Sequence, residues 1–109
     1  MTVGIFTFEL HLGDSRSLKG KRQVVKRLKD RLRARFNVAV SEMNEHDGLW
    51  QRAALVVVSV ADKRDTLERL FEVIHGEAEH LVPGHLVVTG TEFIEAADGG
   101  PSGWSEDWE

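Results

Sequence analysis

The residues with the clearest chemistry are a row of cations between positions 19 and 33. Lys or Arg recurs there at spacings of three and four residues, which places the side chains within about 80° of one another around an α-helix. We call this row the basic ridge; it consists of Lys19, Arg22, Lys26, Lys29 and Arg33. A line of positive charges along a helix can neutralise phosphates of a nucleic acid and release their counterions.

The start of the same helix adds further groups that favour an anion. Ser17 is a suitable N-cap, and the unpaired N–H groups of a first helical turn attract negative charge. The alternative interpretation is an ordinary capped helix. The predicted nucleic-acid or anion-binding residues are Arg16, Lys19, Lys21, Arg22, Lys26, Lys29 and Arg33.

Charge is divided unevenly along the chain. Residues 16–35 contain ten Lys or Arg and one acid, for a local charge of +9, while the rest carries −13 and the whole chain −4. Like charges four residues apart destabilise an isolated helix by about 0.2–0.5 kcal/mol per pair, so we expect the ridge to have a compensating anion. That anion is either a phosphate backbone or the acids of the second helix, Glu68, Glu72 and Glu79.

Other residue types that could do chemistry do not form a recognisable motif. The acids and histidine of residues 42–47 match no metal-binding loop, and we interpret them as a solvated turn. His75, His80 and His85 are five residues apart, so the two on a helix diverge by about 140° and do not share a metal. Without cysteine, the chain has no thiolate ligands, thiol nucleophile or disulfides. We predict no catalytic residues, no metal site and no cofactor.

The elements that must position the ridge follow from the hydrophobic pattern. Alternating or continuous apolar runs predict strands at residues 2–12, 37–43, 50–61 and 85–95, and helical periods predict helices at 17–36 and 62–81, the second capped by Asp62. The order βαββαβ is typical of an α+β, ferredoxin-like sandwich, with a four-stranded antiparallel sheet ordered 4-1-3-2 and both helices on one face.

Length and composition limit the number of domains and the class of protein. At 109 residues, with 41% apolar and 29% charged residues, the chain is one ordinary globular domain, which we place at residues 1–97. Residues 98–109 form an acidic, Gly-rich tail with Trp104 and Trp108. The alternating first residues are not a signal peptide, and no apolar run is long enough to span a bilayer. We therefore expect a cytoplasmic protein without membrane contact.

The helix arrangement leaves one face of the predicted sheet bare. The unbroken apolar run at residues 53–58 predicts a central third strand covered on both faces. The bare face carries Val3, Ile5, Thr7 and their neighbours, a set too apolar to face water. A homodimer through this open sheet face is the predicted solution.

Several motifs occur in a characteristic order: Val3-Gly4, SLKGKR at 17–22, RFNVAVSE at 35–42, Asp47 and Gln51–Ala53. Over about residues 1–95 the chain resembles the YlxP-like family of small bacterial proteins of unknown function. The resemblance implies a ferredoxin-like fold and a cytoplasmic protein, commonly encoded near transcription-elongation, translation-initiation and ribosome-maturation factors. It implies no activity and brings no agreed binding residues. Gly20 stands where the family more usually has an acid, so this site is still more basic.

Two main functions remain open at this point, besides an enzyme acting on a phosphorylated small molecule at the helix start, for which the sequence offers no general base. The first is a non-enzymatic, cytoplasmic homo-oligomer that binds RNA or a ribosome-associated ribonucleoprotein through the basic ridge. The alternative is a protein-interaction or small-ligand regulatory module that works through its sheet-face dimer, with the basic helix merely salt-bridged to the second helix.

Overall fold

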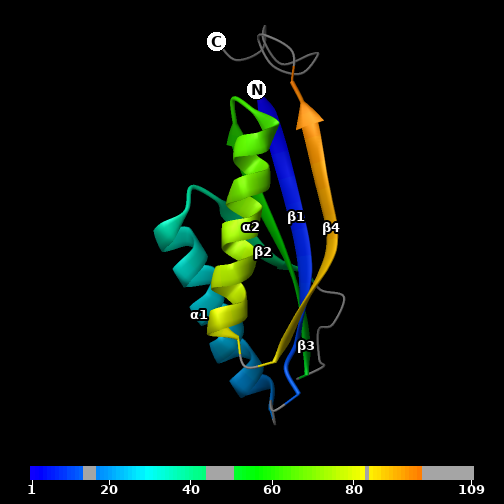
Figure 1. Cartoon of the computed structure of the whole chain (residues 1–109). Helices are drawn as coiled ribbons and strands as arrows, with labels where there is room; N and C mark the ends of the chain where they lie inside the picture. Colours follow the sequence, from blue (N-terminus) through cyan, green and yellow to red (C-terminus); the bar gives the residue numbers. More distant parts are fainter. Residues whose placement is uncertain (14–16, 44–50, 83, 97–109) are drawn as a thin grey trace, which may run out of the picture.

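The computed structural model describes residues 1–13, 17–43, 51–82 and 84–96. Its elements are β1 (Thr2–His11), α1 (Leu18–Arg35), β2 (Ala39–Met43), β3 (Arg52–Ala61), α2 (Arg64–Leu81) and β4 (His85–Glu95). The strands form one antiparallel sheet in the order β2-β3-β1-β4, and both helices lie on the same side of it (Figure 1). This confirms the predicted ferredoxin-like βαββαβ fold and its sheet order, here read from the other edge.

Strand β1 organises the sheet because it pairs along its whole length with both neighbours. Its register with β3 runs from Thr2 opposite Ala61 to His11 opposite Arg52. Buried and half-buried residues alternate at every position, as expected when one face meets a core and the other does not. The side chains on the helix-facing side include Phe6, Phe8 and Leu10, all buried.

The pairing of β1 with β4 contains one irregularity. The register shifts between Thr7 and Phe8, because Gly90 lies opposite Thr7 but Val88 lies opposite Phe8. Thr89 is the extra residue, and its hydroxyl donates to the Thr7 hydroxyl at 3.0 Å. A Cβ at position 90 would lie 2.9 Å from Thr7 Oγ1, so glycine allows this close approach.

Helix α1 follows its predicted boundaries closely. The Ser17 side chain accepts a hydrogen bond of 3.1 Å from the Gly20 N–H, which satisfies one of the donors of the first turn. One stripe of the helix is buried against β2 and β3, at spacings of four, three and four residues. The buried stripe consists of Lys21, Val25, Leu28 and Leu32.

Helix α2 begins later than the sequence predicts. Arg64 is its first residue, Lys63 occupies the N-cap position, and the Lys63 side chain makes no capping hydrogen bond. The prediction of Asp62 as the cap is therefore wrong. Strand β3 continues to Ala61 to pair with Thr2, so residues 62 and 63 are needed to turn the chain before the helix starts. Asp65 still lies in the first turn, where its charge complements the helix dipole.

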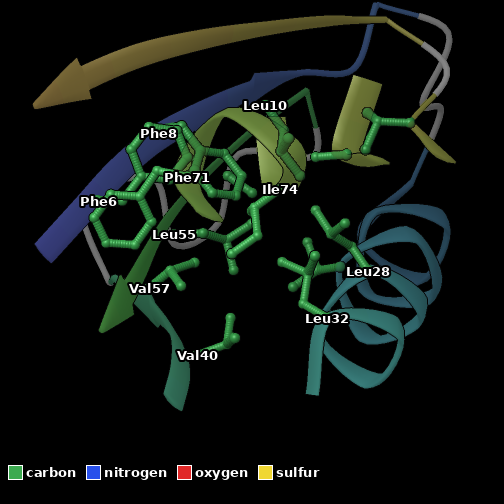
Figure 2. Close-up of a cluster of buried hydrophobic side chains, with 14 of the residues drawn as sticks. Phe6, Phe8, Leu10, Leu28, Leu32, Val40, Leu55, Val57, Phe71 and Ile74 are labelled. Atoms are coloured by element: carbon green, nitrogen blue, oxygen red, sulfur yellow. The ribbon is translucent and has the colours of Figure 1, made fainter. Parts of the chain in front are cut away.

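The core lies between the helices and one face of the sheet (Figure 2). Leu28 and Leu32 of α1 and Ile74 of α2 are almost completely buried there, together with side chains of β1 and β3. The Phe6 and Phe71 rings stack with their centroids 5.1 Å apart. Each fully buried aliphatic or aromatic side chain contributes about 1.5–3 kcal/mol to the free energy of folding.

The second face of the sheet, which we call the open face, is not covered by any described element. β3 is central, as predicted, but its coverage on both faces is not seen among the described residues. Val56 and Val58 are half-buried there, and Val60 is 50% exposed. The predicted hairpin at Asp47-Gly48 and the predicted tail at residues 98–109 lie outside the described residues.

Gly4 allows helix α2 to lie close to the sheet, and its replacement gives a test of the packing. A Cβ at position 4 would lie 2.8 Å from the buried Phe71 ring. We expect Gly4→Ala to lower the free energy of unfolding by about 1–3 kcal/mol, as overpacking does. Gly76→Ala is the control, because a Cβ there meets nothing within 4 Å and removing a helical glycine stabilises by about 0.5–1 kcal/mol. Urea unfolding of both variants measures the two effects, and equal stabilities would contradict the packing described.

Candidate nucleic-acid interface

The basic ridge lies along the outer side of α1, as the helical spacing predicts. Four of its cations, Lys19, Arg22, Lys26 and Arg33, are exposed, and Lys29 is half-buried. With a rise of about 1.5 Å per residue, the ridge extends for about 21 Å. The structure therefore places these five positive charges on one accessible line.

A shallow groove of about 400 Å³ runs beside the ridge. Most of its charged lining comes from the ridge, and it also reaches β2 through Glu42. The lining residues are Arg22, Val25, Lys26, Lys29, Asp30, Arg33 and Glu42. Lys19 is on the same helix side but does not line this groove. Four cations face two carboxylates here, so the groove as a whole favours an anion.

Two cations of the ridge have partners within the protein. Lys26 Nζ donates to Asp30 Oδ2 at 2.6 Å, one helical turn away, and this hydrogen bond is the main cause of the lowered pKa of Asp30. Arg33 Nη2 donates to the Val40 carbonyl at 2.7 Å, which ties the ridge to β2. In contrast, Lys19, Arg22 and Lys29 form no ion pair with a described residue.

Lys21 does not belong to this surface. It is 3% exposed, and its Nζ lies 3.9 Å from Glu42 Oε2. The prediction of Lys21 as an anion-binding residue is therefore corrected. The physical reason is its angular position: Lys21 precedes Val25 by four residues and Leu28 by seven, so it shares their core-facing stripe. Arg16, the other residue predicted at the helix start, lies outside the described residues.

The acids of α2 do not neutralise the ridge in the predicted way. Glu68 Oε1 pairs with Arg64 of its own helix at 3.1 Å, and Glu79 Oε1 pairs with His75 at 2.8 Å. Among the described residues, Glu72 also makes no ion pair with α1. The alternative in which Glu68, Glu72 and Glu79 neutralise the ridge is therefore wrong for the described residues; Glu68 and Glu72 line a groove between α2 and β4 instead.

The two helices are linked instead by Glu77, which the sequence analysis did not single out. Its Oε1 accepts from Arg31 Nε at 3.0 Å and from Arg35 Nη1 at 2.8 Å, and neither arginine belongs to the ridge. These two hydrogen bonds lower the pKa of the Glu77 carboxyl, and the hydrogen bond from Arg31 has the larger effect. The sequence feature that could have identified Glu77 is its position beside the buried Ile74 and Ala78, at the edge of the core-facing stripe of α2.

A second groove, of about 380 Å³, lies between α2 and β4. Its apolar floor includes Phe71 and Phe93, whose ring centroids are 6.0 Å apart. The Arg64 guanidinium lies 4.5 Å from the centroid of the Phe93 ring. The lining residues are Phe6, Arg64, Glu68, Phe71, Glu72, His75, Val88, Thr91 and Phe93.

Two further findings concern metals and membranes. In the part of the chain that the structure describes, no group of three or more His, Asp or Glu side chains is placed to hold a metal ion. Neither of the two described helices has the length and apolar composition that crossing a membrane requires. Of the turn at residues 42–47, only residues 42 and 43 are described.

Comparisons with known proteins give a family without an assigned activity. Residues 3–87 match the model of a family described as "Protein of unknown function (DUF503)". Over 92 residues the chain is 30% identical to the "Uncharacterized protein YlxP" of Bacillus subtilis (strain 168), a match that covers 84% of this chain and 99% of that protein. The resemblance to a YlxP-like family is thereby confirmed. The whole basic ridge falls within the matched residues.

The Glu77 pairing predicts a specific titration behaviour. We expect the Glu77 carboxyl to titrate below the usual range of glutamate in a carbon-detected NMR titration. Because its pKa is lowered in the folded state, the pairing stabilises the fold above the ordinary glutamate pKa, and this stabilisation is lost as the pH falls through the lowered value. Arg31→Gln with Arg35→Gln should return the pKa toward normal. Arg69→Gln, which removes a cation paired with Asp65, should leave it unchanged. An ordinary pKa for Glu77 in the unaltered protein would refute the pairing.

Proposed function

Since this chain belongs to the DUF503 family, whose function is unknown, we propose a role from the surface it presents. We propose that it is a non-enzymatic, cytoplasmic protein that binds RNA, or the RNA of a ribonucleoprotein, through the basic ridge. One observation carries the proposal: Lys19, Arg22 and Lys29 form no ion pair with a described residue, although the rest of the chain has an excess of acids.

The charge balance favours a polyanion over an internal partner. Folding brings Glu77 to Arg31 and Arg35, and Asp30 to Lys26, but leaves most of the ridge facing solvent. Five cations spaced along about 21 Å match an extended array of negative charges better than a single small anion. A phosphate backbone is such an array.

The open face does not offer the alternative mode of RNA recognition. Sheet-based RNA binding stacks bases on aromatic side chains of the two central strands. On β1, Phe6 and Phe8 point toward the helices, and the open-face positions of β1 and β3 carry no Phe, Tyr or Trp. Recognition through α1 would therefore read the backbone and shape of the RNA with little base specificity.

A binding role is favoured over catalysis in the ridge groove. A general base works best with a pKa near the ambient pH. The pKa of Asp30 is lowered by its hydrogen bond with Lys26, which makes this carboxylate a weaker base. Glu42, the other carboxylate of the groove, faces the buried Lys21.

RNA binding is tested by its dependence on salt and on the ridge. We expect the dissociation constant for a structured RNA hairpin, measured by fluorescence anisotropy, to rise with salt with a log–log slope of about 4 when the five cations each meet one phosphate. The triple change Arg22→Glu, Lys26→Glu and Lys29→Glu should weaken binding by at least about tenfold at low salt.

The matched control places the same charge change at the start of α2: Lys63→Glu, Arg64→Glu and Arg69→Glu. This variant should retain most of its affinity, because its changes leave the ridge intact. Circular dichroism establishes that both variants are folded. Equal losses in the two variants, or affinity indifferent to the ridge triple, would eliminate the ridge as the binding surface.

A second candidate function is supported by the groove between α2 and β4. Its stacked phenylalanine floor suits an apolar ring, and Glu72, which has no ion pair among the described residues, suits a positive charge on the same ligand. The protein would then be a small-ligand regulatory module. We expect amine-bearing aromatic fragments to shift the backbone NMR signals of Thr91 and Phe93, and Glu72→Gln to weaken these shifts. Fragments that perturb only residues elsewhere would rule out this groove.

A further inference from the structure

The aliphatic side chains of the open face lie in rows that cross the strands. The register places Ile94, Val3 and Val60 in the first row, Glu92, Ile5, Val58 and Ala39 in the second, and Gly90, Thr7, Val56 and Ser41 in the third. Glu92 is the one charged residue in these three rows of the described sheet. Val60 and Ile94 are each 50% exposed, so the first row ends in accessible aliphatic groups.

The other end of the open face finishes in a polar row. There Glu9 lies between Val87 and Ala54, in a row that continues to Met43, and His11 lies between His85 and Arg52. His11 Nε2 is 3.3 Å from Glu9 Oε1. The face thus has an aliphatic end and a polar end, which limits how a partner surface can be oriented on it.

The size of the open face is compatible with a stable protein interface. Two strands of ten residues, the eleven-residue β4 and the five-residue β2, about 4.8 Å apart and at about 3.3 Å per residue, cover about 570 Å². Two such faces would bury about 1,100 Å² in total, just below the range of standard interfaces and above the roughly 1,000 Å² expected of a biological interface. A contiguous apolar area of several hundred Å² on a monomer usually marks an interaction site.

We propose that the open face is covered by the open face of a second copy of this chain, related by a two-fold axis parallel to the strands. Such an axis places β1 over β3 of the second copy and β4 over β2 of the second copy. Each row of one copy then lies over the same row of the other copy. Val3 then lies over Val60 of the second copy, and Ile5 over Val58. Aligned sheets pack in this way at about −30°.

The positions of the charged groups on the open face favour an axis parallel to the strands over a perpendicular axis. With the axis parallel to the strands, Glu9 lies over Ala54 of the second copy and Glu92 lies over Ala39, so no two carboxylates meet. A two-fold axis perpendicular to the strands would instead reverse the rows and place Val3 over the polar end. That arrangement would place the Arg52 guanidinium over the aliphatic first row, where removal of a charge from water is strongly unfavourable.

This inference does not depend on the RNA-binding proposal. The helices cover the other face of the sheet, so the two basic ridges lie on opposite outer sides of the dimer. Dimer formation and occupancy of the ridge therefore do not compete for surface.

The first test is the mass of the full chain in solution. Multi-angle light scattering after size exclusion, at micromolar concentration, should give twice the chain mass of 12.3 kDa. Val60→Glu should give the monomer mass, because it introduces a charge into the first row. Val73→Glu is the matched control: this valine is 55% exposed on α2, and its variant should remain dimeric. A monomeric wild-type chain overturns the proposal even when a variant fails to fold, and so does a dimer that Val60→Glu leaves intact.

The second test addresses the orientation of the two copies. In the proposed dimer, the carboxylate introduced by Val60→Glu in one chain would face the ammonium group introduced by Val3→Lys in the other. A mixture of the two variants should therefore form a heterodimer, whereas each variant alone should be weakened as a dimer. With the perpendicular axis these positions do not meet, and mixing would restore nothing. Failure of the mixture to associate would overturn the proposed axis. Whether the chain forms a dimer at all is decided separately by the wild-type mass.

Discussion

The antiparallel pairing of β1 with β3 is the interaction on which the rest of the structure depends. It extends over ten residue pairs, and because side chains alternate across a strand, it assigns every residue of both strands to one face. The helices cover one of these faces. A slip of one residue would turn Phe6 and Phe8 toward solvent, so burial of these rings holds the register. The position of α1, and hence of the basic ridge, follows from that register through the packing of Leu28 and Leu32.

Packing explains how α1 tolerates its charge. Repulsion between like charges one turn apart costs about 0.2–0.5 kcal/mol per pair, while each buried leucine contributes about 1.5–3 kcal/mol. Burial is therefore the larger effect. Capping by Ser17 and the favourable placement of Arg33 and Arg35 near the negative end of the helix add smaller contributions. The helix thus remains folded without neutralisation of every cation on its outer side.

Most of the fold could be predicted from periodicity, and the errors share a physical origin. The alternation in β1, the apolar run of β3 and the 3.6-residue periods of the helices are local signals that survive in the structure. The early cap at Asp62, the surface placement of Lys21 and the ridge pairing with Glu68 were wrong because each depends on tertiary context. A long lysine stem is buried when its angular position lies among core residues, and a carboxylate pairs with whichever helix lies beside it. The line of the ridge was predictable because it needs only the helical angle, whereas its partners required the arrangement of α2.

The bulge between β1 and β4 has a consequence for the behaviour of the chain at high concentration. Among the described strands, β4 pairs only with β1, so its outer edge exposes backbone N–H and C=O groups. A regular edge of eleven residues would be a template for the addition of further strands, as in fibrils. The extra residue Thr89 breaks the regular spacing of these groups, and Glu92 would place a charge beside any incoming strand. An irregularity in hydrogen bonding thereby protects a protein with much aliphatic surface from uncontrolled sheet growth.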